Sequence, residues 1–268
     1  MDFSLIIGIL LGIGGLLFGY YLEGGNISSL VLISPFIIVV GGTLGAIIAS
    51  YPINDILQAL KSVKKSFKQP NSNSAQKIID KVSEISSKFR MDGIIAIDRY
   101  VNDPDLQNDE FLLLKEGLIL IQELKKEEDI QYILESEVRS FVHQKSVEVS
   151  IFESAAGYSP TMGVIGTVMG LIVVLSSGFG DPEQLALHIA TAFIATLYGV
   201  AFANIIYLPI AGKLKSLMKR SKIQREMIID GVCLIANSAT ARSVENELSL
   251  YYQAFADGDK KYRAGIDN

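Results

Sequence analysis

The chain has 268 residues, of which 49% are hydrophobic and 20% are charged, and its formal net charge is −5. Residues 1–54 and 154–212 contain no Lys or Arg, so all 24 basic residues fall in 55–153 and 213–268, which excludes a soluble single-core enzyme and a disordered chain. The acidic balance gives no indication of nucleic-acid binding, and the single cysteine, Cys233, excludes an internal disulfide framework and argues against a thiolate metal site.

Four windows without Asp, Glu, Lys or Arg are long enough to cross a membrane as helices. A hydrocarbon core about 30 Å thick needs about 20 apolar residues. The windows are Phe3–Leu22, Ile27–Tyr51, Ser154–Gly180 and Leu185–Gly212. The first lacks a basic leading segment and a small-residue cleavage site, so we interpret it as a permanent helix rather than a signal peptide.

Basic residues near the ends of these windows predict the orientation. Four lysines lie at 61–68 after the second window, and six basic residues lie at 213–225 after the fourth. The short connections 23–26 and 181–184 have no Lys or Arg. Because Lys and Arg gather on the cytoplasmic side, we predict that both termini and the long 52–150 connection are cytoplasmic.

The fold class predicted is an all-α membrane protein with a cytoplasmic helical domain between spans two and three. The parts are 1–54 (spans one and two), 55–150 (cytoplasmic domain), 151–212 (spans three and four) and 213–268 (cytoplasmic C-terminal helices). In the second part, the Pro, Asn and Ser content of 69–74 predicts a turn. Apolar residues at helical spacing then predict four helices, marked by Ile78–Ile85, Gly93–Tyr100, Phe111–Ile121 and Ile130–Phe141, the last running towards span three.

Small residues recur every four positions in the last two spans. They are Ala155, Ser159, Gly163 and Thr167 in span three and Ala195, Gly199 and Ala203 in span four. Such spacing lets helix backbones approach closely. Packing inside one bundle explains some of it, but similar pairs in the first two spans lead us to favour homo-oligomerisation.

Two prolines and two threonines are the candidate functional residues of the last two spans. Pro160 and Pro209 each remove a backbone donor, which indicates either a fixed kink or a hinge beside a hydrated pathway. Thr167 and Thr196 either bond back to their own helices or, on a shared seam, coordinate a small cation or order a water.

Neither of these spans contains Asp or Glu, the residues that usually carry ions through a membrane. If the protein moves ions, the carboxylate must therefore come from another chain. Hydrolase triads, HExxH, phosphate loops and dinucleotide fingerprints are missing too, so we predict no enzyme, cofactor or metal site.

Four segments, in this order and topology, resemble the MotA family of flagellar motor stator subunits. They are GGTLGA at 41–46, SPTMGVIGTVMGL at 159–171, TLYGVAFAN at 196–204 and LPIAGKL at 208–214. The related TolQ and ExbB proteins share the last two spans but have three spans and different loops. The resemblance to MotA covers essentially the whole chain.

The resemblance implies a multi-pass subunit of the bacterial plasma membrane that couples proton or sodium flow to torque on the flagellar rotor. It implies a homopentamer around two chains of a partner, MotB, whose single membrane helix carries the ion-accepting aspartate. Pro160 and Pro209 match the two functional prolines of the family. Thr196 matches a widespread hydroxyl, and Thr167 resembles the sodium-driven branch without deciding the ion.

Two cytoplasmic positions also match the family pattern, with departures. Arg90 and Asp98 match a charged pair that faces the rotor switch protein, although Glu is more usual at the second position. Residues 238–242 align with a Gly-Glu-Asn-Pro-Arg turn, of which only Arg242 is kept, and Ser238 stands in place of the glycine. Two alternatives stay open: a TolQ/ExbB-like energiser of an envelope process, and a membrane scaffold that conducts nothing.

Overall fold

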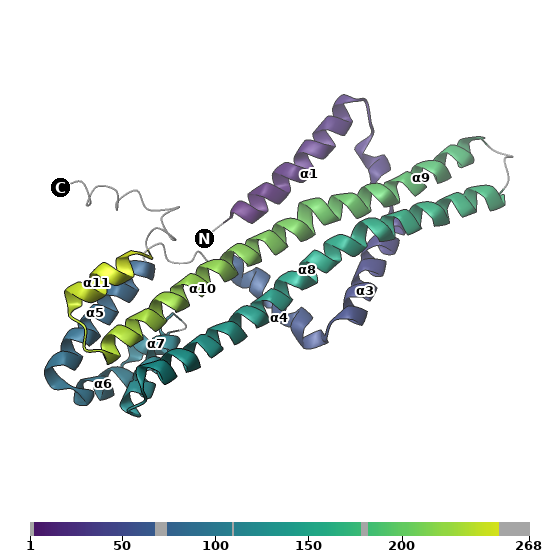
Figure 1. Ribbon diagram of the computed structural model, residues 1–268. Coiled ribbons are helices and arrows are strands. Elements are labelled where there is room, and N and C mark those ends of the chain that lie inside the picture. The colour runs from purple at the N-terminus through teal and green to yellow at the C-terminus, as the bar shows by residue number, and fades with distance from the viewer. Residues whose placement is uncertain (1–2, 68–73, 109, 178–181, 252–268) are drawn as a thin grey trace. The chain divides into compact units, whose positions relative to one another are not determined.

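The computed structural model describes residues 3–67, 74–108, 110–177 and 182–251 (Figure 1). All regular elements in these ranges are helical. The chain divides into two compact units, residues 1–68 with 145–216 and residues 69–144 with 217–268. The predicted turn at 69–74 lies outside the described residues except for Ser74, and so do 178–181 and 252–268.

The first unit contains the apolar helices. They are α1 (Ser4–Leu22), η1 (Ile27–Leu30), α2 (Ile33–Phe36), the π-helical turn η2 (Ile37–Gly41), α3 (Gly42–Ser50), α4 (Ile53–Ser66), the second part of α8 (Glu127–Ser177), α9 (Pro182–Ala201), the π-helical turn η4 (Phe202–Tyr207) and the start of α10 (Leu208–Ala236). Four helical stretches are long and apolar enough to cross a membrane. Large apolar side chains such as Leu11, 70% exposed, lie on their surfaces, as expected for helices that contact lipid.

The second span is less regular than its composition predicted. We expected a helix from Ile27, but a short 3₁₀ turn occupies Ile27–Leu30 and the continuous helix begins at Ile33. The Asn26 side chain caps the turn by accepting from the Ser28 N–H at 3.1 Å. The hydroxyl of Tyr198 accepts from the Leu32 N–H at 3.2 Å and donates to the Leu30 carbonyl, so polar contacts replace the helical bonds here.

The prediction that spans three and four continue as helices beyond their apolar windows is confirmed. Helix α8 runs for 51 residues and passes through Pro160 without a break. Helix α10 runs for 29 residues from Leu208. Both helices contribute residues to both units.

The second unit consists of α5 (Ser74–Asp92), α6 (Ile94–Val101), η3 (Pro104–Gln107), α7 (Leu112–Gln122) and α11 (Ala241–Ser249), together with the first part of α8 and the end of α10. Most of the apolar positions predicted from helical spacing lie in its core, Phe141 excepted, and residues of α10 and α11 that were not predicted complete it. Fully buried members are Ile78, Val82, Ile85, Ile97, Leu114, Leu118, Leu134, Val232 and Leu248. At Gly117 a Cβ would lie 2.5 Å from the Val232 side chain, so this glycine lets α7 and α10 pack closely.

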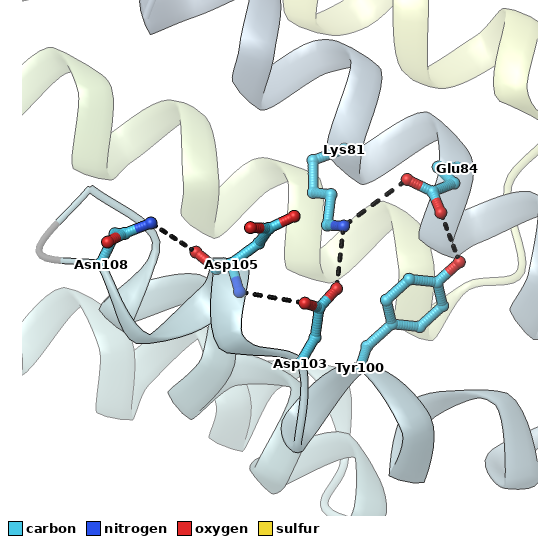
Figure 2. A network of polar contacts seen from close by, with 6 residues as sticks. All are labelled: Lys81, Glu84, Tyr100, Asp103, Asp105 and Asn108. Atoms are coloured by element: carbon cyan, nitrogen blue, oxygen red, sulfur yellow. Dashed lines mark hydrogen bonds and ion pairs between the residues drawn. The ribbon is translucent and has the colours of Figure 1, made fainter.

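A polar network ties the turn after α6 to α5 (Figure 2). Lys81 contacts Asp103 at 3.1 Å and Glu84 at 3.7 Å. Burial opposes the charge of Lys81, but the hydrogen bond to Asp103 and the nearby acids outweigh it and raise the pKa of Lys81. Burial, together with the hydrogen bond from its hydroxyl to Glu84, raises the pKa of Tyr100 to about 12. Lys81 therefore keeps its charge at neutral pH, and the Tyr100 hydroxyl keeps its proton.

Candidate functional site

Helices α8 and α9 touch backbone to backbone along a seam of small residues (Figure 1). A Cβ on Gly163 would lie 2.8 Å from the Ala195 carbonyl oxygen, and one on Gly199 would lie 2.6 Å from the Ser159 carbonyl oxygen. The buried Ser159 hydroxyl donates to the Gly199 carbonyl at 2.9 Å. The glycine spacing read from the sequence is therefore used within one chain at this seam, and these stripes give no separate evidence for oligomerisation.

The seam brings together Thr167 and Thr196, as one of the two sequence interpretations requires. Their hydroxyl oxygens lie 2.5 Å apart. The Thr167 oxygen is also 2.9 Å from the Ala192 carbonyl oxygen and 3.1 Å from that of Gly163. A hydroxyl has one proton to donate. Thr167 therefore donates to one of the two carbonyls, and its oxygen accepts the hydrogen bond that Thr196 donates. The result is a half-buried group of four oxygens between two helices.

Pro160 and Pro209 lie near two different irregularities. Pro160 lies against the seam, because its Cα would be 3.1 Å from a Cβ on Gly199. Pro209 directly follows the π-helical turn η4, in which the Leu208 N–H donates to the Ala203 carbonyl five residues back. A single π-helical turn shifts the register of the hydrogen bonds, and such turns are frequent at functional sites. The sequence indicated the prolines but not this register shift.

An aromatic cluster supports the seam from the second span. Phe36 packs edge-to-face on Tyr198 and Phe202, with ring centroids 6.4 and 6.0 Å away. Tyr198 stacks on Phe202 at 5.7 Å. Sequence reasoning missed these residues, since aromatic side chains in an apolar helix carry no signal that separates a lipid-facing ring from a packed one.

Ionised side chains appear only at the edge of the seam helices. Glu153 pairs with Lys215 at 3.2 Å, and Lys145 pairs with the buried Glu148 at 2.7 Å. Between Glu153 and Asp181 the sequence has no acid, nor between Glu183 and Glu226. The described residues hold no group of three or more His, Cys, Asp or Glu side chains that could bind a metal. Hydroxyl and carbonyl oxygens can coordinate a cation or water, but these groups do not take up a proton near neutral pH.

Arg90 and Asp98 lie on opposite sides of one tight turn in the second unit. Arg90 is in the last turn of α5 and Asp98 is on α6, and both are exposed. Gly93 joins the helices with a φ of +62°, a value that favours glycine. Asp98 accepts a 3.0 Å hydrogen bond from Gln122 at the end of α7. The two charges therefore share one exposed turn.

Comparisons with known proteins identify the family. Residues 106–227 match the MotA/TolQ/ExbB proton channel family, and residues 6–93 match the motility protein A N-terminal family. Motility protein A of Bacillus subtilis is 30% identical over 254 residues, which cover 95% of this chain and 92% of that protein. The chain belongs to the motility protein A family of flagellar stator subunits.

Solved structures of MotAB share this fold. MotAB of C. jejuni matches with a TM-score of 0.85 at 27% identity, over 94% of this chain and 96% of that chain. The flagellar MotAB stator complex of Bacillus subtilis matches with a TM-score of 0.83 at 29% identity, over 94% and 98%. The family resemblance drawn from the four sequence segments is thereby confirmed.

Proposed function

We propose that this chain, together with MotB, couples inward flow of protons or sodium ions to torque on the flagellar rotor. The observation that carries the proposal is the α8–α9 seam, which groups four oxygens and contains no carboxylate. An ion pathway of this kind needs an acid from another chain. The matched structures are complexes with MotB, which makes MotB the natural source of it.

We further propose a homopentamer around two MotB chains in the bacterial plasma membrane, with both termini in the cytoplasm. The orientation is supported by the basic residues at 61–68 and 213–225, since both groups follow an apolar helix. The 55–150 and 213–268 parts then form the cytoplasmic region. The transported ion is the only small ligand that the function requires.

The energy available limits what the ion can change. One charge crossing the membrane supplies about 2.3 kcal/mol per 100 mV. That amount biases a two-state helix arrangement but does not reorganise a packed unit. We assign the hinges to Pro160, which removes one backbone donor from α8, and to Pro209, which follows the π-helical turn η4. Neutralising the partner's carboxylate would act on these hinges, with Thr167 and Thr196 lining the path.

The exposed Arg90 and Asp98 are the residues that we assign to the contact with the rotor switch protein. They lie on either side of Gly93, Arg90 in α5 and Asp98 in α6, and α8 and α10 pack with α5 in the same unit. The side chain of Asp98 is shorter than the Glu usual in the family, and its carboxylate accepts a hydrogen bond from Gln122.

Native mass spectrometry of the complex co-purified with MotB tests the assembly, and swimming assays test the function. We expect a mass corresponding to five copies of this chain and two of MotB, and we expect the chain to restore swimming to a strain lacking its own subunit. A TolQ/ExbB-like energiser would instead co-purify with an envelope-spanning partner and restore no swimming. A non-conducting scaffold would assemble without ion flux in liposomes.

A further inference from the structure

A groove of about 510 Å³ lies between the first half of α1 and the start of α10. Gly8 and Gly12 of α1 line it, together with Ile205, Pro209 and Gly212 on the other side. In Figure 1 the two helices approach here, and α1 then diverges from α9 towards its other end. All lining residues belong to the first unit.

Of the glycines that line this groove, Gly12 packs against Ile205, whose side chain would lie 3.2 Å from a Cβ there, but Gly8 and Gly212 face open space. A Cβ on Gly8 or Gly212 would meet no atom within 4 Å, whereas one on Gly163 or Gly199 would meet backbone. A gap of this size between apolar helices loses dispersion contacts unless something fills it. Its volume lies within the range of about 300–1,000 Å³ that is typical of small-molecule sites.

The two ends of the groove differ in polarity. At one end Lys213 donates to the Ser4 hydroxyl at 3.3 Å, and Ser216 is nearby on the same wall. The other end, at Gly12 and Ile205, is apolar. Described residues of the lining include no acid. Ser4 and Gly12 are eight residues apart on α1, or about 12 Å of helix, close to the apolar depth of one leaflet.

We propose that this groove binds one anionic phospholipid, with the phosphate on Lys213 and Ser4 and an acyl chain along Gly8 and Gly12. The anionic charge complements a groove whose one ionised side chain is a lysine, and the apolar wall suits the chain. The cytoplasmic leaflet, where the proposed orientation puts Lys213, is the one rich in such lipids. The inference uses that orientation from the proposed function but not the coupling of ion flow to torque.

The lipid would contact the segment that surrounds Pro209. Ile205, inside the π-helical turn, and Pro209 both line the groove. An acyl chain there fills the space beside the register shift and would oppose movement of α10 towards α1. The bound lipid therefore acts as part of the packing of the hinge.

Native mass spectrometry of the purified complex, exchanged into detergent with added phosphatidylglycerol or phosphatidylcholine, tests the proposal. We expect phosphatidylglycerol to stay bound to the wild-type complex. Gly8→Leu fills the open space and should abolish that binding. Lys213→Gln should weaken phosphatidylglycerol binding about fivefold and leave phosphatidylcholine unaffected.

Gly19→Leu is the matched control, because Gly19 is on the same helix, has no atom within 4 Å of its Cβ position, and lies outside the groove. Equal phosphatidylglycerol binding by wild type, Gly8→Leu and Lys213→Gln would overturn the proposal. A different result would be that the wild-type complex carries no lipid and that the Gly8→Leu complex loses subunits. That result would show that a second copy of this chain fills the groove. Ion flux by the same complexes in liposomes reports separately on the proposed function.

Discussion

The hydroxyl oxygens of Thr167 on α8 and Thr196 on α9 lie 2.5 Å apart, although the residues are 29 positions apart in the chain. Glycines on both helices make this contact possible, since Gly163 and Gly199 bring the backbones together one turn away. The seam therefore combines close packing with a small group of oxygens. Substitutions of the threonines change the group of oxygens, and substitutions of the glycines change the close packing.

Replacing Thr167 with Val keeps the shape of the side chain and removes its hydroxyl. We expect the complex to lose about 0.6 kcal/mol of stability, typical of a hydrogen bond between membrane helices, and to lose most of its ion flux. Thr167→Ser should retain flux because the oxygen stays. Both hydroxyls share one contact, so the double variant Thr167→Val, Thr196→Val should lose less stability and less flux than the losses of the two single variants added together. Additive losses of flux would show that they act separately.

Gly163→Ala and Gly199→Ala should open the seam. Each Cβ would lie within 2.8 Å of a backbone carbonyl oxygen, which cannot move as a flexible side chain can. We expect a loss of about 1–3 kcal/mol in thermal unfolding of the detergent-solubilised complex, as for other overpacked sites. Gly45→Ala is the control, since its Cβ meets nothing within 4 Å. Wild-type stability of Gly199→Ala would contradict the close contact.

Among the described residues, Leu124 (φ 56°) and Ser238 (φ 52°) are the two non-glycine positions with left-handed backbone, and both follow a helix end. At each, the next residue's N–H reaches back to a carbonyl in the helix, from Lys125 to Leu120 and from Ala239 to Leu234, in a C-terminal motif that favours glycine. We expect Leu124→Gly and Ser238→Gly each to raise stability by about 1 kcal/mol. Leu124→Ala should not, because it keeps the strain while removing a side chain that is 78% exposed.

Glu116 on α7 gives the second unit a pH dependence. The hydrogen bond with Glu137, then burial and the charge of Glu137, raise the pKa of Glu116 to about 7, against the opposing charge of Arg225. The guanidinium of Arg225 on α10 lies 3.7 Å from the Glu137 carboxylate and 4.0 Å from the Phe141 ring centre, both on α8. Arg225 and Glu137 therefore pair between α8 and α10.

Because the raised pKa belongs to the folded state, Glu116 stabilises it fully below its unfolded value of 4.5, and this contribution is lost as the pH rises through about 7. The carboxyl is largely exposed, so we expect an effect below about 1 kcal/mol. Glu116→Gln should therefore be more stable than wild type at pH 8 and equal to it near pH 4, in thermal unfolding. The exposed Glu245→Gln on α11 is the control. If the stability difference between Glu116→Gln and wild type were the same at pH 4 and pH 8, it would contradict a proton held between Glu116 and Glu137.

The sequence predicted the helical class, the four apolar stretches and most of the buried positions of α5, α7 and the first part of α8, because hydropathy and helical spacing are local properties. The sequence left two interpretations of Thr167 and Thr196 open, and the structure shows features of both: the hydroxyls meet between α8 and α9, and Thr167 also lies within hydrogen-bond distance of Gly163 on its own helix. Packing inside one bundle was expected to explain some of the small-residue stripes, and the α8–α9 seam uses them in this way.

Other features had no local signal. Tyr198 bonds to residues about 166 positions away, at the start of the second span, and this contact shortens the helix expected from Ile27. The π-helical turn before Pro209 packs on Gly12 of α1 through Ile205, and neither the turn nor this contact follows from the local sequence. The left-handed backbone at Ser238, which stands where the family turn has glycine, was not predicted either.

The most direct test of the account is cation flux into liposomes that contain this chain alone or the chain with MotB, under a membrane potential. The chain contributes oxygens but no titratable acid to its seam. We therefore expect flux only when both proteins are present, and we expect it to disappear when the membrane aspartate of MotB is replaced by Asn. Dissipation of a cation gradient by this chain alone would contradict the account.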